Sequence, residues 1–94
     1  MKAIWNDVVI AQSDDVLQVE GNYYFPKNAL NSDYFEESET TSHCAWKGQA
    51  NYLNVSIDGK VSQDAAWYYA HPKPDAQEIE GRVAFWKDVE VKAN

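Results

Sequence analysis

The chain has 94 residues, with fifteen acidic and eight basic side chains and a formal net charge of −7. A chain of this length is expected to form one domain, here residues 1–94, with a radius of gyration of about 12 Å. Its negative charge repels phosphate backbones and anionic lipid head groups, so we expect no nucleic-acid partner and no membrane partner. The basic residues are also scattered along the chain, without a run of like charge.

No apolar stretch reaches the roughly 20 residues of a membrane helix, and the N-terminus lacks the pattern of a signal peptide, which together predict a cytoplasmic protein. A single cysteine excludes an internal disulfide and a multi-cysteine zinc site. The two histidines, His43 and His71, lack close ligand spacing, so we expect no metal and no other cofactor. Four Trp, six Tyr and three Phe residues must therefore supply much of the core.

The first quarter of the chain predicts two β-hairpins. Apolar runs within residues 3–11 flank Asn6-Asp7, which is the pattern of a tight turn between two strands. Residues 16–25 repeat this arrangement around Gly21-Asn22, a pair that tolerates positive φ.

After Phe25 the alternation of apolar and polar residues ends. Residues 26–30 could form one helical turn after Pro26, which cannot donate a ladder hydrogen bond. The acidic, serine-rich run at residues 33–39 shows no apolar alternation and predicts a surface loop.

The longest predicted strand covers residues 50–57, after a turn or bulge at Lys47-Gly48. Its residues divide by alternation into one face with Asn51, Leu53, Val55 and Ile57 and another with Ala50, Tyr52, Asn54 and Ser56. Asp58-Gly59 is the strongest hairpin signal in the chain and should fold the following residues back along this strand, with residues 65–69 either completing the return or bending away.

The last quarter predicts a short helix and a closing hairpin. Pro74, followed by acidic residues, is typical of a helix start, and Gly81 of its end. Residues 82–86 and 89–91 then flank a turn at Lys87-Asp88. Many short strands at this spacing predict a mainly β domain, a small antiparallel barrel-like or two-sheet structure with one or two short helices.

Two ring-rich segments dominate the candidate functional residues. Residues 43–52 hold the only cysteine, and residues 67–74 hold Trp67-Tyr68-Tyr69 followed by His71-Pro72-Lys73-Pro74. We expect these segments to pack against each other and to enclose a recess. Because neighbouring strand residues alternate faces, at least one ring of the trio must point away from the others.

The chain resembles the DUF427 family, in a match that spans nearly its whole length. The residues that carry the resemblance are Cys44, Trp46-Lys47-Gly48, Ala50, Tyr52, Asp64-Ala65-Ala66-Trp67-Tyr68-Tyr69, Pro72 and Gly81-Arg82-Val83-Ala84-Phe85-Trp86. The resemblance implies a small bacterial domain of uncharacterised function, which has also carried a nucleotidyltransferase-like label. One departure is Ala45, where many relatives have proline, so the turn there has less rigidity.

The residues argue against that label. Polymerase-type nucleotidyl transfer uses a Gly-Ser element for phosphates and a strand-borne Asp-x-Asp or Asp-x-Glu pair for magnesium. The sequence has no Gly-Ser pair and no such carboxylate pair within an apolar strand.

Three functional hypotheses remain. The first is a binding domain for a small planar or anionic ligand, with an aromatic pocket and a Lys or Arg rim. Its candidate residues are Trp46, Lys47, Tyr52, Trp67, Tyr69 and Arg82.

The second hypothesis is an enzyme that uses Cys44 or a Tyr/Lys pair. Cys44 is a weak candidate, because in an extended segment His43 and Lys47 would lie on the opposite side of the backbone from it. A buried cysteine that acts as a small hydrophobic side chain is the simpler interpretation.

The third hypothesis is a protein-interaction module that pairs through a sheet edge or an aromatic patch, including with itself. The sequence determines neither the ligand nor the oligomeric state.

Overall fold

The computed structural model describes residues 1–94 and shows a mainly β fold, as predicted. Nine strands and three 3₁₀ segments follow one another along the chain. Their bounds are β1 (Lys2–Trp5), β2 (Val8–Gln12), β3 (Leu17–Val19), β4 (Asn22–Tyr24), η1 (Lys27–Ala29), η2 (Ser32–Tyr34), β5 (Phe35–Cys44), β6 (Gly48–Ile57), β7 (Lys60–Tyr68), η3 (Pro74–Ile79), β8 (Val83–Phe85) and β9 (Glu90–Lys92).

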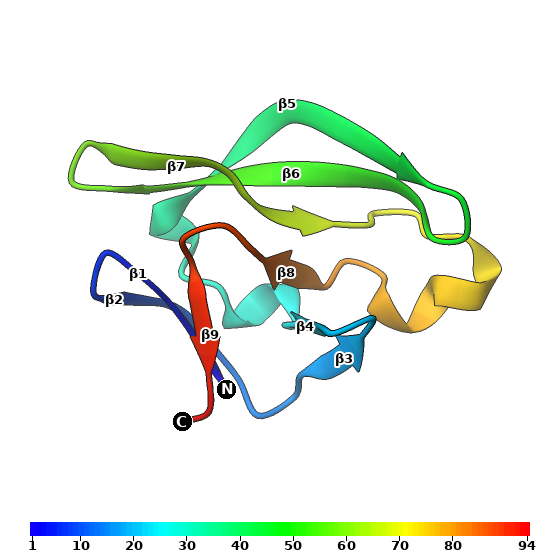
Figure 1. Cartoon of the computed structure of the whole chain (residues 1–94), viewed down its shortest axis with the longest axis horizontal. Helices are drawn as coiled ribbons and strands as arrows, with labels where there is room; N and C mark the ends of the chain where they lie inside the picture. Colours follow the sequence, from blue (N-terminus) through cyan, green and yellow to red (C-terminus); the bar gives the residue numbers. More distant parts are fainter.

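The strands form three antiparallel sheets and no closed barrel, within the mainly β, antiparallel class that the sequence predicts as a barrel-like or two-sheet structure. A four-stranded sheet has the order β5-β6-β7-β8, a three-stranded sheet has the order β2-β1-β9, and β3 pairs with β4. In Figure 1, β5, β6 and β7 lie across the top and the two smaller sheets lie below, with β8 between them. The radius of gyration is 12.5 Å, close to the value expected from length.

Three tight turns form at, or within one residue of, the positions that the sequence predicts. Asn6-Asp7, Glu20-Gly21 and Asp58-Gly59 each have positive φ at both central residues, which is the geometry of a type I′ hairpin turn. The second turn lies one residue earlier than predicted. These three hairpins, together with the helical turn η1 and the short helical segment η3, confirm the local predictions for these parts of the chain.

The predicted surface loop at residues 33–39 is wrong. This segment contains η2 and the first half of β5, the outer strand of the large sheet. An edge strand whose side chains point mostly to solvent has no apolar alternation, and for this reason its residues carry no strand signal. The pairing register of β5 with β6 shifts between Glu37 and Thr41. Asp64 of β7 stabilises this irregular part of β5, because its carboxylate accepts hydrogen bonds from the hydroxyls of Ser38 and Thr40.

The predicted closing hairpin is also wrong, although the turn at Lys87-Asp88 is present. β8 pairs with β7, whereas β9 crosses to the other sheet and pairs with β1. The Asp88 carboxylate stabilises this crossing, since it accepts hydrogen bonds from Trp5 Nε1 at 3.0 Å and from Ser62 Oγ at 2.6 Å. One carboxylate therefore joins both sheets to the segment that connects them.

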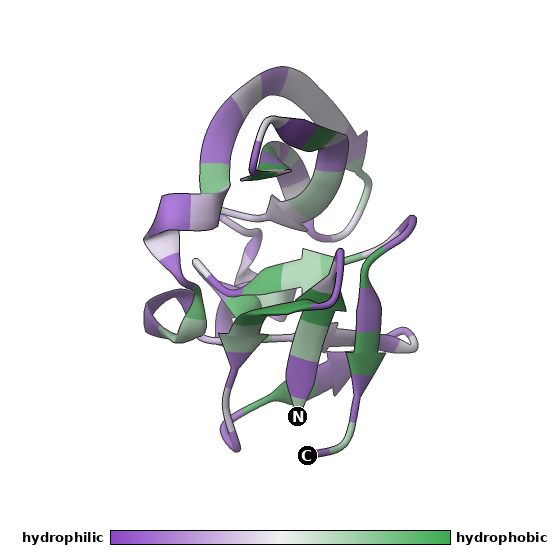
Figure 2. Cartoon of the chain, turned by 90° about the vertical axis from the view of Figure 1, so that its left-hand side faces the viewer, coloured by the Kyte–Doolittle hydropathy of each residue, from purple (hydrophilic) through white to green (hydrophobic).

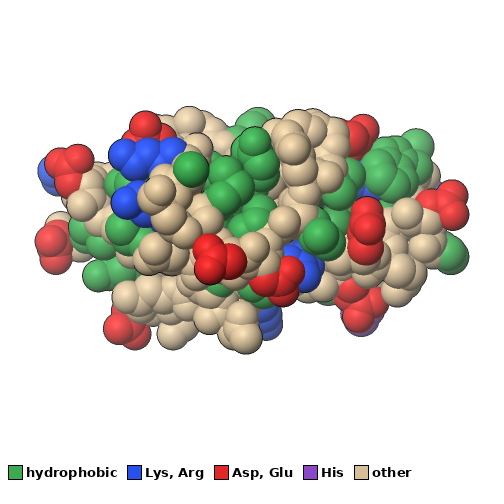
Figure 3. All heavy atoms as spheres, turned by 90° about the horizontal axis from the view of Figure 1, so that it is seen from below, with side chains coloured by type: hydrophobic (Ala, Val, Ile, Leu, Met, Phe, Trp, Pro, Cys, Tyr) green, Lys and Arg blue, Asp and Glu red, His purple; other side chains and the backbone are tan.

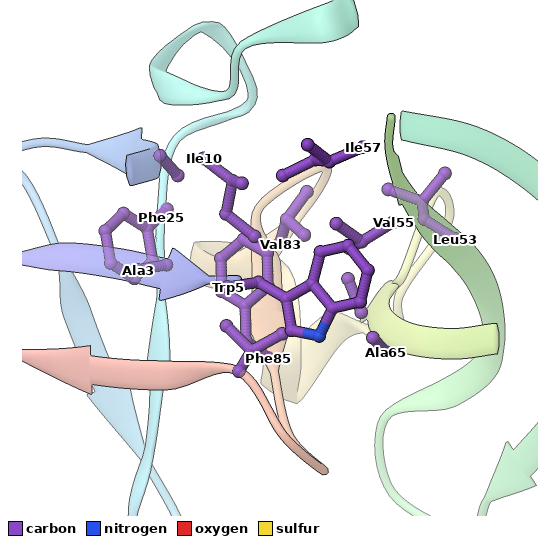
Figure 4. Packing of buried hydrophobic residues seen from close by; sticks show 13 residues of the cluster. Ala3, Trp5, Ile10, Phe25, Leu53, Val55, Ile57, Ala65, Val83 and Phe85 are labelled. Atoms are coloured by element: carbon purple, nitrogen blue, oxygen red, sulfur yellow. The ribbon is translucent and has the colours of Figure 1, made fainter. Parts of the chain in front are cut away.

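The main core lies between the large sheet and the strands below it. Figure 4 shows Trp5 and Ile10 from the lower sheet directed toward Val55 of the upper sheet, with Val83 and Phe85 of β8 among them. Phe85 also meets Phe25 edge to face at a centroid distance of 5.5 Å. Hydrophobic residues concentrate on the lower strands in Figure 2, whereas the strand that arches over the top is mainly hydrophilic.

A second, smaller buried cluster lies on the other face of β6. Leu53, Val55 and Ile57 belong to the main core, whereas Ala50 and Tyr52 pack in the second cluster, which confirms the predicted division of this strand into two faces. The buried members of the second cluster are Tyr24, Ala50, Tyr69, Ala76, Ile79 and Ala84.

On the surface, charged side chains of both signs are interspersed. Figure 3 shows one face of the molecule, on which Lys and Arg side chains occur at several places among acidic, hydrophobic and other groups. Among the helical segments, none has the length and apolar character needed to cross a membrane.

We predict that Asp88→Ala destabilises the fold by about 1–3 kcal/mol at pH 7, because the Trp5 and Ser62 donors would lose a charged acceptor. The hydrogen bonds from Ser62 and Trp5 hold the pKa of the Asp88 carboxyl below its ordinary value. This stabilisation is therefore present above about pH 4 and is lost as the pH falls through the lowered pKa of the folded state.

Urea unfolding at pH 7 and at successively lower pH measures the effect. The difference between wild type and Asp88→Ala should shrink on acidification, whereas Glu78→Ala, which removes an exposed carboxylate, should change little at any pH. A difference that stays constant into strong acid would contradict the role of the charged form.

Candidate functional site

The site begins at the hairpin turn that connects β5 to β6. Residues 45–47 form the turn, and Gly48 follows with φ +107°, a conformation that other residues rarely adopt. A Cβ at Gly48 would meet the backbone oxygen of His71 and atoms of Lys73, each at 3.7 Å. These are ordinary van der Waals distances, so the positive φ, and not a lack of space, favours glycine here, and the segment after β7 packs directly against the turn.

Hydrogen bonds hold the two ring-rich segments together, as we expected from their composition. The Lys73 N–H donates to the Lys47 carbonyl at 2.9 Å, and Lys73 Nζ donates to the Ala45 carbonyl at 2.7 Å. Residues far apart in sequence therefore meet at one place.

A recess of about 210 Å³ opens beside this contact. It is lined by Lys47, Tyr52, Trp67, Tyr69 and Trp86. The rings stand at angles to one another: Trp67 and Trp86 are 5.9 Å apart between centroids at 82°, and Tyr52 and Trp86 are 6.4 Å apart at 41°. Below, we call this the aromatic recess.

Lys47 is the only charged side chain of the aromatic recess and is 6% exposed. Its ammonium forms an ion pair with Glu20, which lies at the turn between β3 and β4 and whose side chain is 53% exposed. The Nζ atom also lies 5.3 Å from the centroid of the Trp46 ring and 5.6 Å from that of Tyr69. These distances are within the range of cation–π attraction.

The ion pair keeps both partners charged at neutral pH. Burial by itself would lower the pKa of Lys47, but the hydrogen bond to Glu20 and the neighbouring phenols raise it above its ordinary value. The same hydrogen bond lowers the pKa of Glu20. Burial raises the pKa of Tyr69, so its phenol is protonated at neutral pH as well.

Polar contacts behind the recess orient its rings. The fully buried Tyr24 meets Trp67 edge to face at 6.3 Å, and Trp67 Nε1 donates to the Tyr24 hydroxyl at 3.3 Å. The hydroxyls of Tyr52 and Ser42 are hydrogen-bonded at 2.9 Å. Two of the rings are therefore fixed by the protein itself.

The structure brings four of the six predicted ligand-site residues together: Lys47, Tyr52, Trp67 and Tyr69. Trp46 stands next to Lys47 with 40% of its surface exposed but does not line the recess. Arg82 lies elsewhere, because its guanidinium pairs with the Asp15 carboxylate at 3.2 Å and donates to the Asp15 carbonyl at 2.9 Å.

Two residues of the site were missed from sequence. Trp86 was assigned to a strand of the closing hairpin, and its approach to the recess depends on β8 pairing with β7. The sequence places Glu20 at the end of a strand before a turn, and the residues next to it give no signal that it pairs with Lys47. The pairing of distant elements decides both positions.

The trio Trp67-Tyr68-Tyr69 alternates as predicted. Trp67 and Tyr69 face the aromatic recess, whereas Tyr68 packs against the main core on the other side and donates a hydrogen bond to Glu37 Oε1 at 2.6 Å.

Cys44 ends β5 as a half-buried residue that packs against the second cluster. The chain does bend after it, at Ala45, yet no hydrogen bond connects its thiol with His43, His71 or Lys47. Its contacts are those of a small hydrophobic side chain.

No group of three His, Cys, Asp or Glu side chains converges as a metal site would require. One Asp-x-Glu spacing does occur, at Asp88 and Glu90, but the Asp88 carboxylate is occupied by Trp5 and Ser62. The magnesium-binding pair of a nucleotidyltransferase is thus not formed by these residues.

Fold and site together define a small, mainly β domain whose aromatic recess surrounds a nearly buried lysine. The model of the family described as "Domain of unknown function (DUF427)" matches residues 1–93, and the chain belongs to this family. A search of curated proteins found no match.

We predict that the Cys44 thiol reacts with a disulfide reagent more slowly in the native protein than in the urea-unfolded chain, because it is packed and lacks an activating partner. His43→Gln and His71→Gln should leave the native rate within about two-fold of wild type, since neither imidazole is hydrogen-bonded to the thiol. A native rate above that of the unfolded chain, reduced by either substitution, would instead indicate an activated thiolate.

Proposed function

We propose that this domain binds a small planar anion in the aromatic recess, with the rings of the recess against its faces and Lys47 paired with its negative group. The observation that supports this proposal is a lysine that is only 6% exposed and yet carries its ammonium to the wall of an aromatic recess. Burying a charged group is unfavourable unless it is paired, and the carboxylate that pairs with Lys47, that of Glu20, is half exposed and can be exchanged for the anionic group of a ligand.

The size of the recess limits the ligand. Its volume of about 210 Å³ is below the roughly 300–1,000 Å³ of pockets for drug-sized molecules. It suits a molecule of about one ring. Aromatic walls favour a flat ligand, because rings interact best stacked with an offset or edge to face.

Glu20 acts as an internal competitor in this proposal. Its side chain is half exposed, whereas that of Lys47 is nearly buried, so Glu20 is the partner that can move aside into water. A bound carboxylate would take its place on the ammonium and leave the net charge of the site unchanged.

Binding is favoured over catalysis by the protonation states. A general base works best with a pKa near the operating pH. Burial raises the pKa of Tyr69, whereas for Lys47 the lowering by burial is outweighed by the hydrogen bond to Glu20 and the neighbouring phenols, which raise its pKa. Lys47 Nζ also lies over the face of the Tyr69 ring. This geometry is that of a cation–π interaction and not that of a proton transfer between the ammonium and the phenol.

A second candidate function is protein interaction, supported by the exposure of Trp46 and Trp86, at 40% and 46%. Sedimentation over a range of concentrations tests self-association. A monomer at all concentrations whose recess still binds an anion would leave the ligand-binding proposal in place.

We predict saturable binding of benzoate, followed by tryptophan fluorescence and by NMR shifts of residues in the recess. Benzamide tests the charge, and cyclohexanecarboxylate tests planarity; both should bind at least several-fold more weakly. Lys47→Met should weaken benzoate binding by ten-fold or more, whereas Lys60→Met, at an exposed lysine in the hairpin after β6, should not. Equal binding to wild type and Lys47→Met would overturn the proposal.

We predict that Glu20→Gln strengthens benzoate binding by about two- to five-fold, the factor expected when a partly exposed ion pair no longer competes. The same titration measures it, with Glu78→Gln as a control for net charge. Weaker binding to Glu20→Gln would mean that Glu20 positions Lys47 for the ligand and does not compete with it.

A further inference from the structure

A second and larger cavity, of about 450 Å³, lies on the opposite side of β7 from the aromatic recess. It is bounded by residues of β5, β6 and β7, by η1 and η2, and by the segment that enters β8. The residues that line it are Lys27, Leu30, Ser32, Phe35, Glu37, Leu53, Tyr68, Ala70, Glu80, Gly81 and Val83. None of them lines the aromatic recess. We call it the second cavity.

Its interior is apolar. Leu53 and Val83 are buried members of the main core, and Leu30, Phe35 and Tyr68 pack against that core from the sides. Leu53 and Val83 can be followed in Figure 4, where they come from different elements of the large sheet. The volume is within the roughly 300–1,000 Å³ typical of pockets for small organic ligands.

Its edge carries more negative than positive charge. Glu37 and Glu80 provide two carboxylates, and Lys27 provides one ammonium. The three ion pairs of the protein involve none of these side chains, so the carboxylates are not neutralised. Glu37 is instead held by the Tyr68 hydroxyl at 2.6 Å, and burial together with this contact raises the pKa of Tyr68, which keeps the hydroxyl a donor.

We propose that the second cavity is a separate ligand site for a small amphipathic cation, which places an apolar body on Leu53, Phe35 and Val83 and a protonated amine beside Glu37 and Glu80. The apolar interior favours the apolar body of the ligand, because removing apolar surface from water is favourable. The carboxylates decide between a cation and an anion of the same shape.

The test uses three probes with the same ring and different head groups: 2-phenylethylamine, 2-phenylethanol and phenylacetate. Titration of the ¹⁵N-labelled protein at pH 7, followed by two-dimensional NMR, should show saturable shifts at Glu37, Tyr68 and Gly81 with the amine. The alcohol should bind about three- to ten-fold more weakly, and phenylacetate more weakly still. Equal affinity for amine and phenylacetate would overturn the proposal, as would shifts confined to residues outside the second cavity.

Isosteric variants separate charge from shape. Glu37→Gln and Glu80→Gln should each weaken amine binding by about three- to ten-fold, and Glu37→Gln retains an oxygen acceptor for Tyr68. Glu36→Gln is the matched control, because it removes the same charge from the neighbouring position of β5, outside the second cavity. If Glu36→Gln weakens binding as much as the other two, only net charge is acting and the proposed site is rejected.

Lys47→Met separates this proposal from that of the aromatic recess. The variant should lose benzoate binding and keep amine binding unchanged. A Lys47→Met protein that folds but no longer binds the amine would show that the amine occupies the recess, which overturns the second site.

Discussion

The Lys47 side chain is almost entirely removed from water, and the structure around the aromatic recess depends on how its charge is compensated. Transfer of such an ion into a protein interior costs several kcal/mol unless partners replace its hydration. Here a carboxylate arrives from the turn between β3 and β4, and two aromatic rings approach from the turn before β6 and the end of β7. The lysine therefore ties the small two-stranded sheet to the large one, so that the position of the ammonium and the relation between these sheets fix each other.

The strand β7 gives the domain its two candidate sites. Because its side chains alternate, Trp67 and Tyr69 serve the aromatic recess, while Tyr68 serves the second cavity. The electrostatic character of the two differs: the recess presents an ammonium and the cavity presents two carboxylates. This one strand, paired on both sides in the sheet, thus separates a recess with one ammonium from a cavity with two carboxylates and one ammonium. Membership of the DUF427 family supplies no activity for either site, so these side chains are the basis on which function has to be argued.

Much of the local structure followed from short-range chemistry. The turns at Asn6-Asp7 and Asp58-Gly59 were predicted because these residue types accept positive φ, and the division of β6 into two faces was predicted from its alternation. The first half of the edge strand β5 was not predicted, because a strand that buries few side chains has no alternation of apolar residues. The contribution of Trp86 to the recess was missed for a different reason: it depends on which strand β8 selects as its partner.

The sequence by itself determined the β class, the tight turns, the alternation of Trp67, Tyr68 and Tyr69, and four of the five residues that line the aromatic recess. These are properties of neighbouring residues, governed by backbone sterics and by the two-residue repeat of a strand. Only the tertiary structure decided that there are three sheets, that β9 leaves β8 for β1, that Glu20 rather than solvent faces Lys47, and that Arg82 pairs with Asp15. Each of these depends on contacts between segments that are distant in the chain. The packing of the whole core determines which segments meet, and no short stretch of residues contains this information.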